Sequence, residues 1–123
     1  METGISYTSR AHVNEHLTAL HLGSGDLPVL ATPAMMALME NAAMKCVAPH
    51  LQATETTVGS QIESSHLRPT PVGEEFEATA TLTAIEGRKL TFHVTASDGK
   101  GVIGEGHHVR YIVDRDRFLA KLK

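Results

Sequence analysis

The residues ATPAMMALMENAAMKC, positions 31–46, form the longest helix-like segment of the chain. Thr32 followed by Pro33 is typical of a helix start, because a threonine hydroxyl can cap the first backbone amides and proline suits the first turn. Pro49 disfavours continuation of the helix. We therefore predict one long helix from residue 33 to about residue 47, with Thr32 as its N-cap and apolar residues over most of its circumference.

Five segments around this helix are predicted to be β-strands. The segment that begins at residue 75 is the clearest, because FEATATLTA alternates apolar with polar side chains. SDGKG at 97–101 contains Asp-Gly and predicts a tight hairpin. The five predicted strands are residues 5–13, 56–68, 75–85, 89–97 and 102–113. Residues 14–30 are expected to form a loop, and residues 114–123 a short amphipathic helix.

The order of these elements predicts an α+β fold: one strand, the long helix, and then four strands in an antiparallel meander. Such a sheet is larger than one helix can cover, and the helix is more apolar than one contact requires. Both observations indicate that a second subunit supplies the missing burial. The length of 123 residues predicts a single domain over residues 1–123.

Composition and charge argue against several classes of function. The formal net charge is −3, which does not favour a protein that neutralises nucleic-acid phosphates. No segment approaches the roughly 18 apolar residues that indicate a membrane span, and no apolar signal sequence is visible. The single cysteine, Cys46, fits a reducing compartment, so a cytoplasmic location is expected. The sequence contains neither HExxH nor a cysteine cluster, and we expect no metal and no cofactor.

Glu40 is the unexpected residue of the predicted helix, since it falls inside the apolar arc between Met36 and Met44. No basic residue lies one turn away to neutralise it. A buried carboxylate is costly unless it is paired or protonated. Two interpretations stay open: the side chain reaches water at the edge of the arc, or it is a half-buried carboxylate that acts as a base or nucleophile.

Three other residues, Thr32, His66 and Gly59, could contribute to a functional site. Thr32, besides its capping role, lies where a helix N-terminus could bind the oxygen of a thioester carbonyl. His66 near the end of its predicted strand is either a general base or a surface residue. Gly59 within the same strand marks a bulge or the close approach of a ligand. His107 and His108 point to opposite sides of one strand and make a poor metal pair.

Together these features resemble a hot-dog fold thioesterase, and specifically the fluoroacetyl-CoA thioesterase-like family. The resemblance covers most of the chain and is carried, in this order, by LATPAMMALMENAA, VGSQIESSHLRPTPVGEEFEATATL, IEGRKLTFHVTASDG and IGEGHHVRYIV. It implies a hot-dog fold, in which a five-stranded antiparallel sheet wraps around one long central helix. It also implies a homodimer or a dimer of dimers with active sites at the subunit interface, and hydrolysis of a small acyl-CoA.

The resemblance assigns roles to five positions. The family's catalytic threonine, glutamate and histidine correspond to Thr32, Glu40 and His66. Its strand glycine and the arginine of its G-x-H-x-R strand correspond to Gly59 and Arg110, which would contact the substrate. The fluoroacetyl-specific member carries phenylalanine before its helix, whereas GSGDLPVL here contains no aromatic residue, so the resemblance does not extend to the acyl group.

Two alternatives to a thioesterase remain. A hot-dog (R)-specific hydratase or dehydratase also uses histidine with an acidic residue, and a non-catalytic module would bind acyl-CoA without hydrolysing it. The eight-residue spacing between Thr32 and Glu40 favours hydrolysis. In that reaction Glu40 either attacks the thioester or activates water, with His66 as the acid or base.

Overall fold

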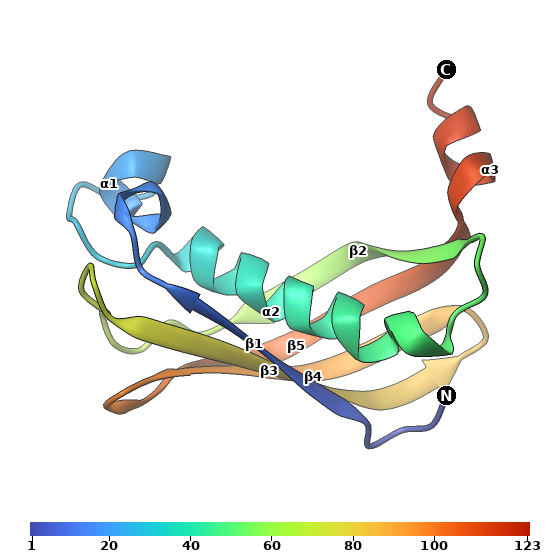
Figure 1. Cartoon of the computed structure of the whole chain (residues 1–123), viewed down its shortest axis with the longest axis horizontal. Helices are drawn as coiled ribbons and strands as arrows, with labels where there is room; N and C mark the ends of the chain where they lie inside the picture. The colour runs from blue at the N-terminus through green and yellow to red at the C-terminus, as the bar shows by residue number, and fades with distance from the viewer.

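One long helix, α2 (Thr32–Val47), lies along one face of a curled five-stranded sheet (Figure 1). The computed structural model describes all 123 residues. The strands are β1 (Ser6–His12), β2 (Glu55–Ser64), β3 (Glu75–Glu86), β4 (Lys89–Asp98) and β5 (Gly101–Asp114). The shorter helices are η1 (Glu15–Leu17), α1 (Ala19–Leu22), η2 (Ala48–His50) and α3 (Arg115–Ala120). All strand pairs are antiparallel, so the predicted α+β architecture is confirmed.

The order of the strands differs from the predicted meander. The sheet runs β1-β3-β4-β5-β2, so only β3, β4 and β5 follow one another, while β2 pairs with β5 at an edge. Ten residues that include Pro69 and Pro71 separate β2 from β3. A hairpin needs a much shorter connection, and this one is long enough to cross the end of the sheet. The prediction of a four-strand meander is therefore wrong for β2.

The core lies between α2 and the sheet. Met35 and Met39 of α2 are fully buried there, as are Phe92 and Leu82 of the sheet. Burial of each such large side chain contributes roughly 1.5–3 kcal/mol. The other buried residues of α2 are Ala34, Ala42, Ala43, Cys46 and Val47. The buried side of the helix is thus the one that faces the strands, and it holds no charged residue.

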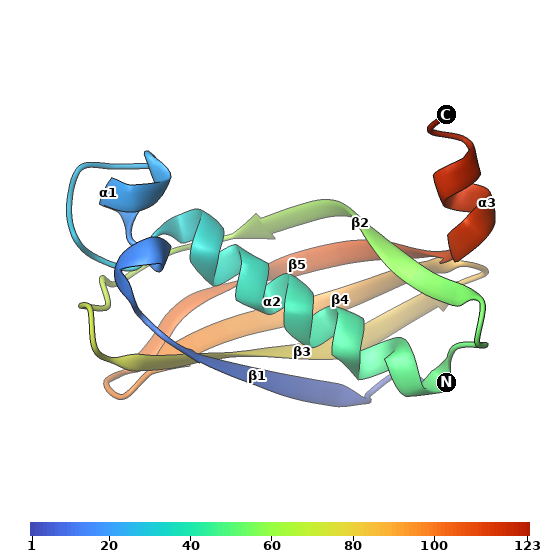
Figure 2. The same ribbon diagram turned by 45° about the horizontal axis from the view of Figure 1, so that its top comes forward.

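The opposite side of α2 is also apolar but is not covered by this chain. Met36 is half-buried, and Ala37 and Met44 are exposed. Met44 borders a cavity together with Thr56 and Thr57 of the edge strand β2. Figure 2 shows β2 beside α2, and the outer edge of β2 pairs with no other strand. Within a single chain, nothing covers the apolar surface on this side of α2, as the sequence led us to expect.

Two local predictions are wrong at the start of α2. The N-cap is Ala31, with no side-chain capping bond, and Thr32 is the first helical residue. Its hydroxyl bonds to His66 and is thereby used in a tertiary contact. The predicted loop before the helix contains two short helices, η1 and α1, and Thr18 caps α1 by accepting a hydrogen bond from the amide of His21.

Candidate functional site

The first part of the candidate site is a pair formed by Thr32 and His66. The Oγ1 atom of Thr32 lies 2.7 Å from Nδ1 of His66, although the residues come from the start of α2 and from the segment after β2. The pair borders a cavity of about 260 Å³. The cavity is lined by Ala19, Ser24, Val29, Leu30, Thr32, His66, Leu67, Arg68 and Pro69. The lining is mixed: polar side chains such as Thr32 and His66 stand beside Ala19, Val29 and Leu30, and such a cavity is a suitable place for a small acyl group.

His66 is held as a weak base by its surroundings. Its Nε2 atom is buried and has no hydrogen-bond partner in the chain. Burial lowers the pKa of His66 below its ordinary value of 6.5, although the backbone of Arg68 acts in the opposite direction. The imidazole is therefore neutral at pH 7 and can accept a proton.

The segment that carries His66 is held in place by contacts with β5 and with Asp98, the last residue of β4. The amide of Leu67 donates to the carbonyl of Ile103, which extends the contact with β5 beyond the end of β2. The Thr70 hydroxyl donates to Asp98, and Arg68 lies 3.6 Å from the same carboxylate. Burial raises the pKa of Asp98, but the Lys100 amide, the Thr70 hydroxyl and the Arg68 charge outweigh it, so the net pKa is lowered. This ionised carboxylate fixes the histidine segment.

The second part of the site is the close approach of β2 to Glu40 at Gly59. A Cβ atom at Gly59 would lie 2.9 Å from Oε2 of Glu40 and 3.2 Å from Cε1 of His108. The register with β5 shifts between Gly59 and Gln61, as at a bulge. Only glycine leaves room for the carboxylate here. Glu40 itself is half-buried, on the uncovered side of α2. This burial fits a half-buried carboxylate, and it also leaves part of the side chain in contact with water.

Arg110 is buried beside this carboxylate, with 7% of its surface exposed. Its Nε donates to Oγ1 of Thr57 at 2.8 Å, its Nη2 to the Thr57 carbonyl at 3.0 Å, and its Nη1 to Nε2 of His108 at 3.1 Å. Burial lowers the pKa of Arg110, and the charge of Glu40 acts to raise it. Thr57 was missed in the sequence, although it lies two residues before Gly59 and therefore faces the same side of β2.

The two parts of the site do not meet within one chain. Thr32 and Glu40 are eight residues apart on α2, which corresponds to about 12 Å along the helix axis. The cavity beside His66 does not include Glu40. The structure thus brings Thr32 to His66, and Gly59 to Glu40 and Arg110, as two separate groups.

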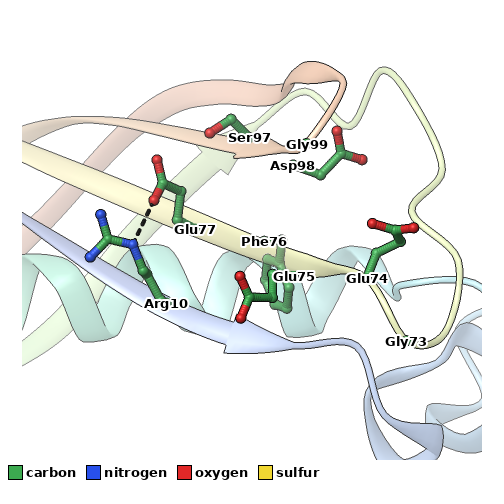
Figure 3. A pocket seen from close by; sticks show the side chains of 9 residues that line it. All are labelled: Arg10, Gly73, Glu74, Glu75, Phe76, Glu77, Ser97, Asp98 and Gly99. Atoms are coloured by element: carbon green, nitrogen blue, oxygen red, sulfur yellow. Dashed lines mark hydrogen bonds and ion pairs between the residues drawn. The ribbon is translucent and has the colours of Figure 1, made fainter.

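A larger cavity lies elsewhere on the chain. It has a volume of about 400 Å³ and is bordered by β1, β3 and the turn after β4 (Figure 3). Its lining includes Glu74, Glu75, Glu77 and Asp98, with Arg10 paired to Glu77 at 2.9 Å. Carboxylates repel phosphate groups, so this cavity does not suit coenzyme A. No group of three or more potential metal ligands is present, and none of the helices is long and apolar enough to span a membrane.

Comparison with known proteins gives consistent matches. The family model described as fluoroacetyl-CoA-specific thioesterase matches residues 13–116. The fluoroacetyl-CoA thioesterase of Streptantibioticus cattleyicolor is 36% identical over 129 residues, which cover 100% of this chain and 93% of that protein. The solved structure of a variant of this type of thioesterase, in complex with acetyl-CoA, superposes with a TM-score of 0.94 at 34% identity, and covers 99% of this chain and 96% of that one.

More distant structures agree in their fold. A hot-dog-like protein from Thermanaerovibrio acidaminovorans superposes with a TM-score of 0.89 at 20% identity, over 99% of this chain and 90% of that one. The predicted hot-dog fold is therefore confirmed.

Proposed function

The chain belongs to the fluoroacetyl-CoA-specific thioesterase family, and on this premise we propose that it hydrolyses a small acyl-CoA to a free acid and coenzyme A. The observation that carries the proposal is the hydrogen bond between Thr32 and His66 beside an acyl-sized cavity. In the reaction the oxygen of water bonds to the acyl carbon, the C–S bond breaks, and a proton passes to the departing thiolate.

Glu40, Thr32 and His66 are the catalytic residues of this proposal. Glu40 either attacks the thioester carbonyl or removes a proton from the attacking water. His66, which is neutral at pH 7, exchanges protons with the water and the thiol, and Thr32 holds its ring in place. Gly59 and Arg110 contact the substrate beside Glu40, where a side chain at position 59 would collide with the carboxylate.

We also propose that two chains complete each site. Because about 12 Å of helix separates Thr32 from Glu40, one copy supplies Thr32 and His66 and a second copy supplies Glu40, Gly59 and Arg110. The uncovered apolar side of α2 and the free edge of β2 support a homodimer or a dimer of dimers. Glu40 lies on that uncovered side, between Met36 and Met44, where a second copy would reach it.

The nature of the acyl group follows from the cavity. Its walls include Ala19, Val29 and Leu30, and no phenylalanine, tyrosine or tryptophan borders it. A related thioesterase binds acetyl-CoA. We therefore propose a short acyl chain without a requirement for fluorine. A cytoplasmic location is part of the proposal, because acyl-CoA substrates are made inside the cell.

A panel of short, branched, aromatic and halogenated acyl-CoAs tests the function. Release of free thiol from at least one short acyl-CoA, detected with a thiol reagent, is the expected result. A hydratase would instead change the enoyl absorbance without releasing thiol. A binding module would show saturable binding with neither signal, and either outcome would overturn the proposal.

A further inference from the structure

We propose that His108 is a positioning residue: it accepts a hydrogen bond from Arg110 and so holds the guanidinium, with its charge intact, beside Glu40. This inference rests on the proposed function, because it concerns the carboxylate that acts on the thioester. His108 has no assigned role in the sequence, and its neighbour His107 points to the other side of the strand.

The contacts of His108 leave only one protonation state. The side chain is 1% exposed. Its Nδ1 lies 2.7 Å from the carbonyl oxygen of Gln61, and a carbonyl can only accept, so Nδ1 carries the proton. Its Nε2 lies 3.1 Å from Nη1 of Arg110, and a guanidinium can only donate, so Nε2 carries a lone pair. His108 is thus a neutral imidazole in a single tautomer.

Burial agrees with this assignment. It lowers the pKa of His108 below its ordinary value of 6.5 and is the largest effect. The backbone of Gln61 and the charge of Glu40 act to raise the pKa, and the charge of Arg110 lowers it further. The neutral form is therefore maintained at pH 7.

The guanidinium of Arg110 donates hydrogen bonds to neutral acceptors on two strands. Thr57 of β2 accepts at Nε and Nη2, and His108 of β5 accepts at Nη1. None of the ion pairs of the chain includes Arg110. A buried cation without a direct partner is costly, so its retention needs a reason.

The reason for a buried cation at this position is its closeness to Glu40, across the space where Gly59 lacks a side chain. The position that a Cβ atom would occupy there is 2.9 Å from Oε2 of Glu40 and 3.4 Å from Nη1 of Arg110. The carboxylate and the cation therefore border the same small volume. A carboxylate in place of His108 would cancel the charge of Arg110, and an apolar residue would leave Nη1 without an acceptor. A neutral imidazole orients the cation and leaves its charge to act on Glu40.

Two substitutions of His108 separate this role from simple packing. His108→Gln can place an amide oxygen near the position of Nε2 and keep the acceptor for Arg110. His108→Asn can keep the donor to Gln61 near the position of Nδ1 but has no acceptor within reach of Arg110. We expect kcat to fall by about 10²-fold in the Asn variant with KM little changed, because the loss is one of orientation. The Gln variant should retain most of the native kcat.

The matched controls are His107→Gln and His107→Asn, at an exposed neighbour on the same strand that pairs with Glu63. Both should leave kcat unchanged. Equal kcat values for His108→Gln and His108→Asn, or a loss expressed only in KM, would overturn the proposal. If the His108 variants do not fold, Thr57→Val decides in their place. It removes the acceptor of Nε while the hydrogen bond from Nη1 to His108 remains. An unchanged kcat in that variant would show that the reaction does not depend on how the guanidinium is held, which is the premise of the proposal.

A measurement without substrate distinguishes this inference from the proposed function. In NMR spectra of the native protein, the Nη protons of Arg110 should be resolved, because three hydrogen bonds restrict rotation of the guanidinium. They should average in His108→Asn and remain resolved in His108→Gln. Unchanged signals in the Asn variant would overturn the positioning role even if the enzyme is active. Absence of thiol release by the native protein would instead overturn the proposed function.

Discussion

The hydroxyl of Thr32 and Nδ1 of His66 lie 2.7 Å apart, although 34 positions separate the two residues in the sequence. This contact uses the oxygen that would otherwise cap the helix, and leaves the cap position to Ala31, which forms no side-chain bond. A threonine at a cap typically stabilises its helix by about 1 kcal/mol. Here the hydroxyl orients a histidine instead, which suits a residue that serves a reaction.

Removal of the carboxylate of Glu40 tests its catalytic role. Glu40→Gln keeps the shape of the side chain but removes its ability to attack or to accept a proton. We expect kcat for thiol release to fall by about 10²–10⁴-fold, the usual scale for such a group. The fold should persist, because the residue is only half-buried and accepts no hydrogen bond from the chain. Near-native turnover across the acyl-CoA panel would exclude the role.

The Thr32–His66 pair should behave as a unit. Thr32→Val and His66→Asn each break the same hydrogen bond, and we expect each to lower kcat by about 10²-fold. The double variant should lose little more than either single one, because the two residues act through one contact. Kinetics of the four proteins in a double-mutant cycle measure this coupling, and strictly additive losses would show that the residues act independently. Thr54→Val, at an exposed threonine, is the control.

Crowding at Gly59 should impair the site without unfolding the protein. In Gly59→Ala the new methyl group would lie 2.9 Å from Oε2 of Glu40, so the carboxylate must move. A displacement of about 1 Å can cost 10²-fold in rate, and we expect a loss of that order in kcat. Gly99→Ala is the matched control, since nothing lies within 4 Å of its Cβ position. Equal activities of the two variants would contradict the close approach.

Acid should inactivate the enzyme through His66. The pKa of His66 is lowered from 6.5, so the neutral base persists to a more acidic pH than for a free histidine. We expect kcat/KM to be constant at neutral pH and to fall as the pH drops through the lowered pKa of His66. This acidic fall in the pH profile should be absent from the residual activity of His66→Asn. A fall centred above pH 6.5 would contradict the effect of burial.

Mixing of two inactive variants tests whether the site is shared. Glu40→Gln retains Thr32 and His66, and His66→Asn retains Glu40. After subunit exchange about half of the dimers are mixed, and each has one complete site if the residues come from different chains, so about a quarter of the native activity should return. No recovery, in a mixture that native mass spectrometry shows to be exchanged, would place the whole site within one chain.

Much of the fold could be predicted because it depends on neighbouring residues. Apolar periodicity located α2, and alternation and turn residues located β3, β4 and β5 to within a few residues. The same periodicity singled out Glu40 as a carboxylate among methionines. The candidate site residues themselves came from the resemblance to a family, since spacing alone left His66 and Thr32 with ordinary alternatives.

The sequence by itself determined the long apolar helix, the alternating strands and the anomaly at Glu40, since each is a property of residues within a few positions of one another. Only the tertiary structure decided that β2 pairs with β5, that Thr32 bonds to His66, and that Glu40 lies over Gly59 beside Arg110. These contacts join segments that are distant in the chain. Their partners are chosen by packing of the whole sheet around the helix, which no local pattern specifies.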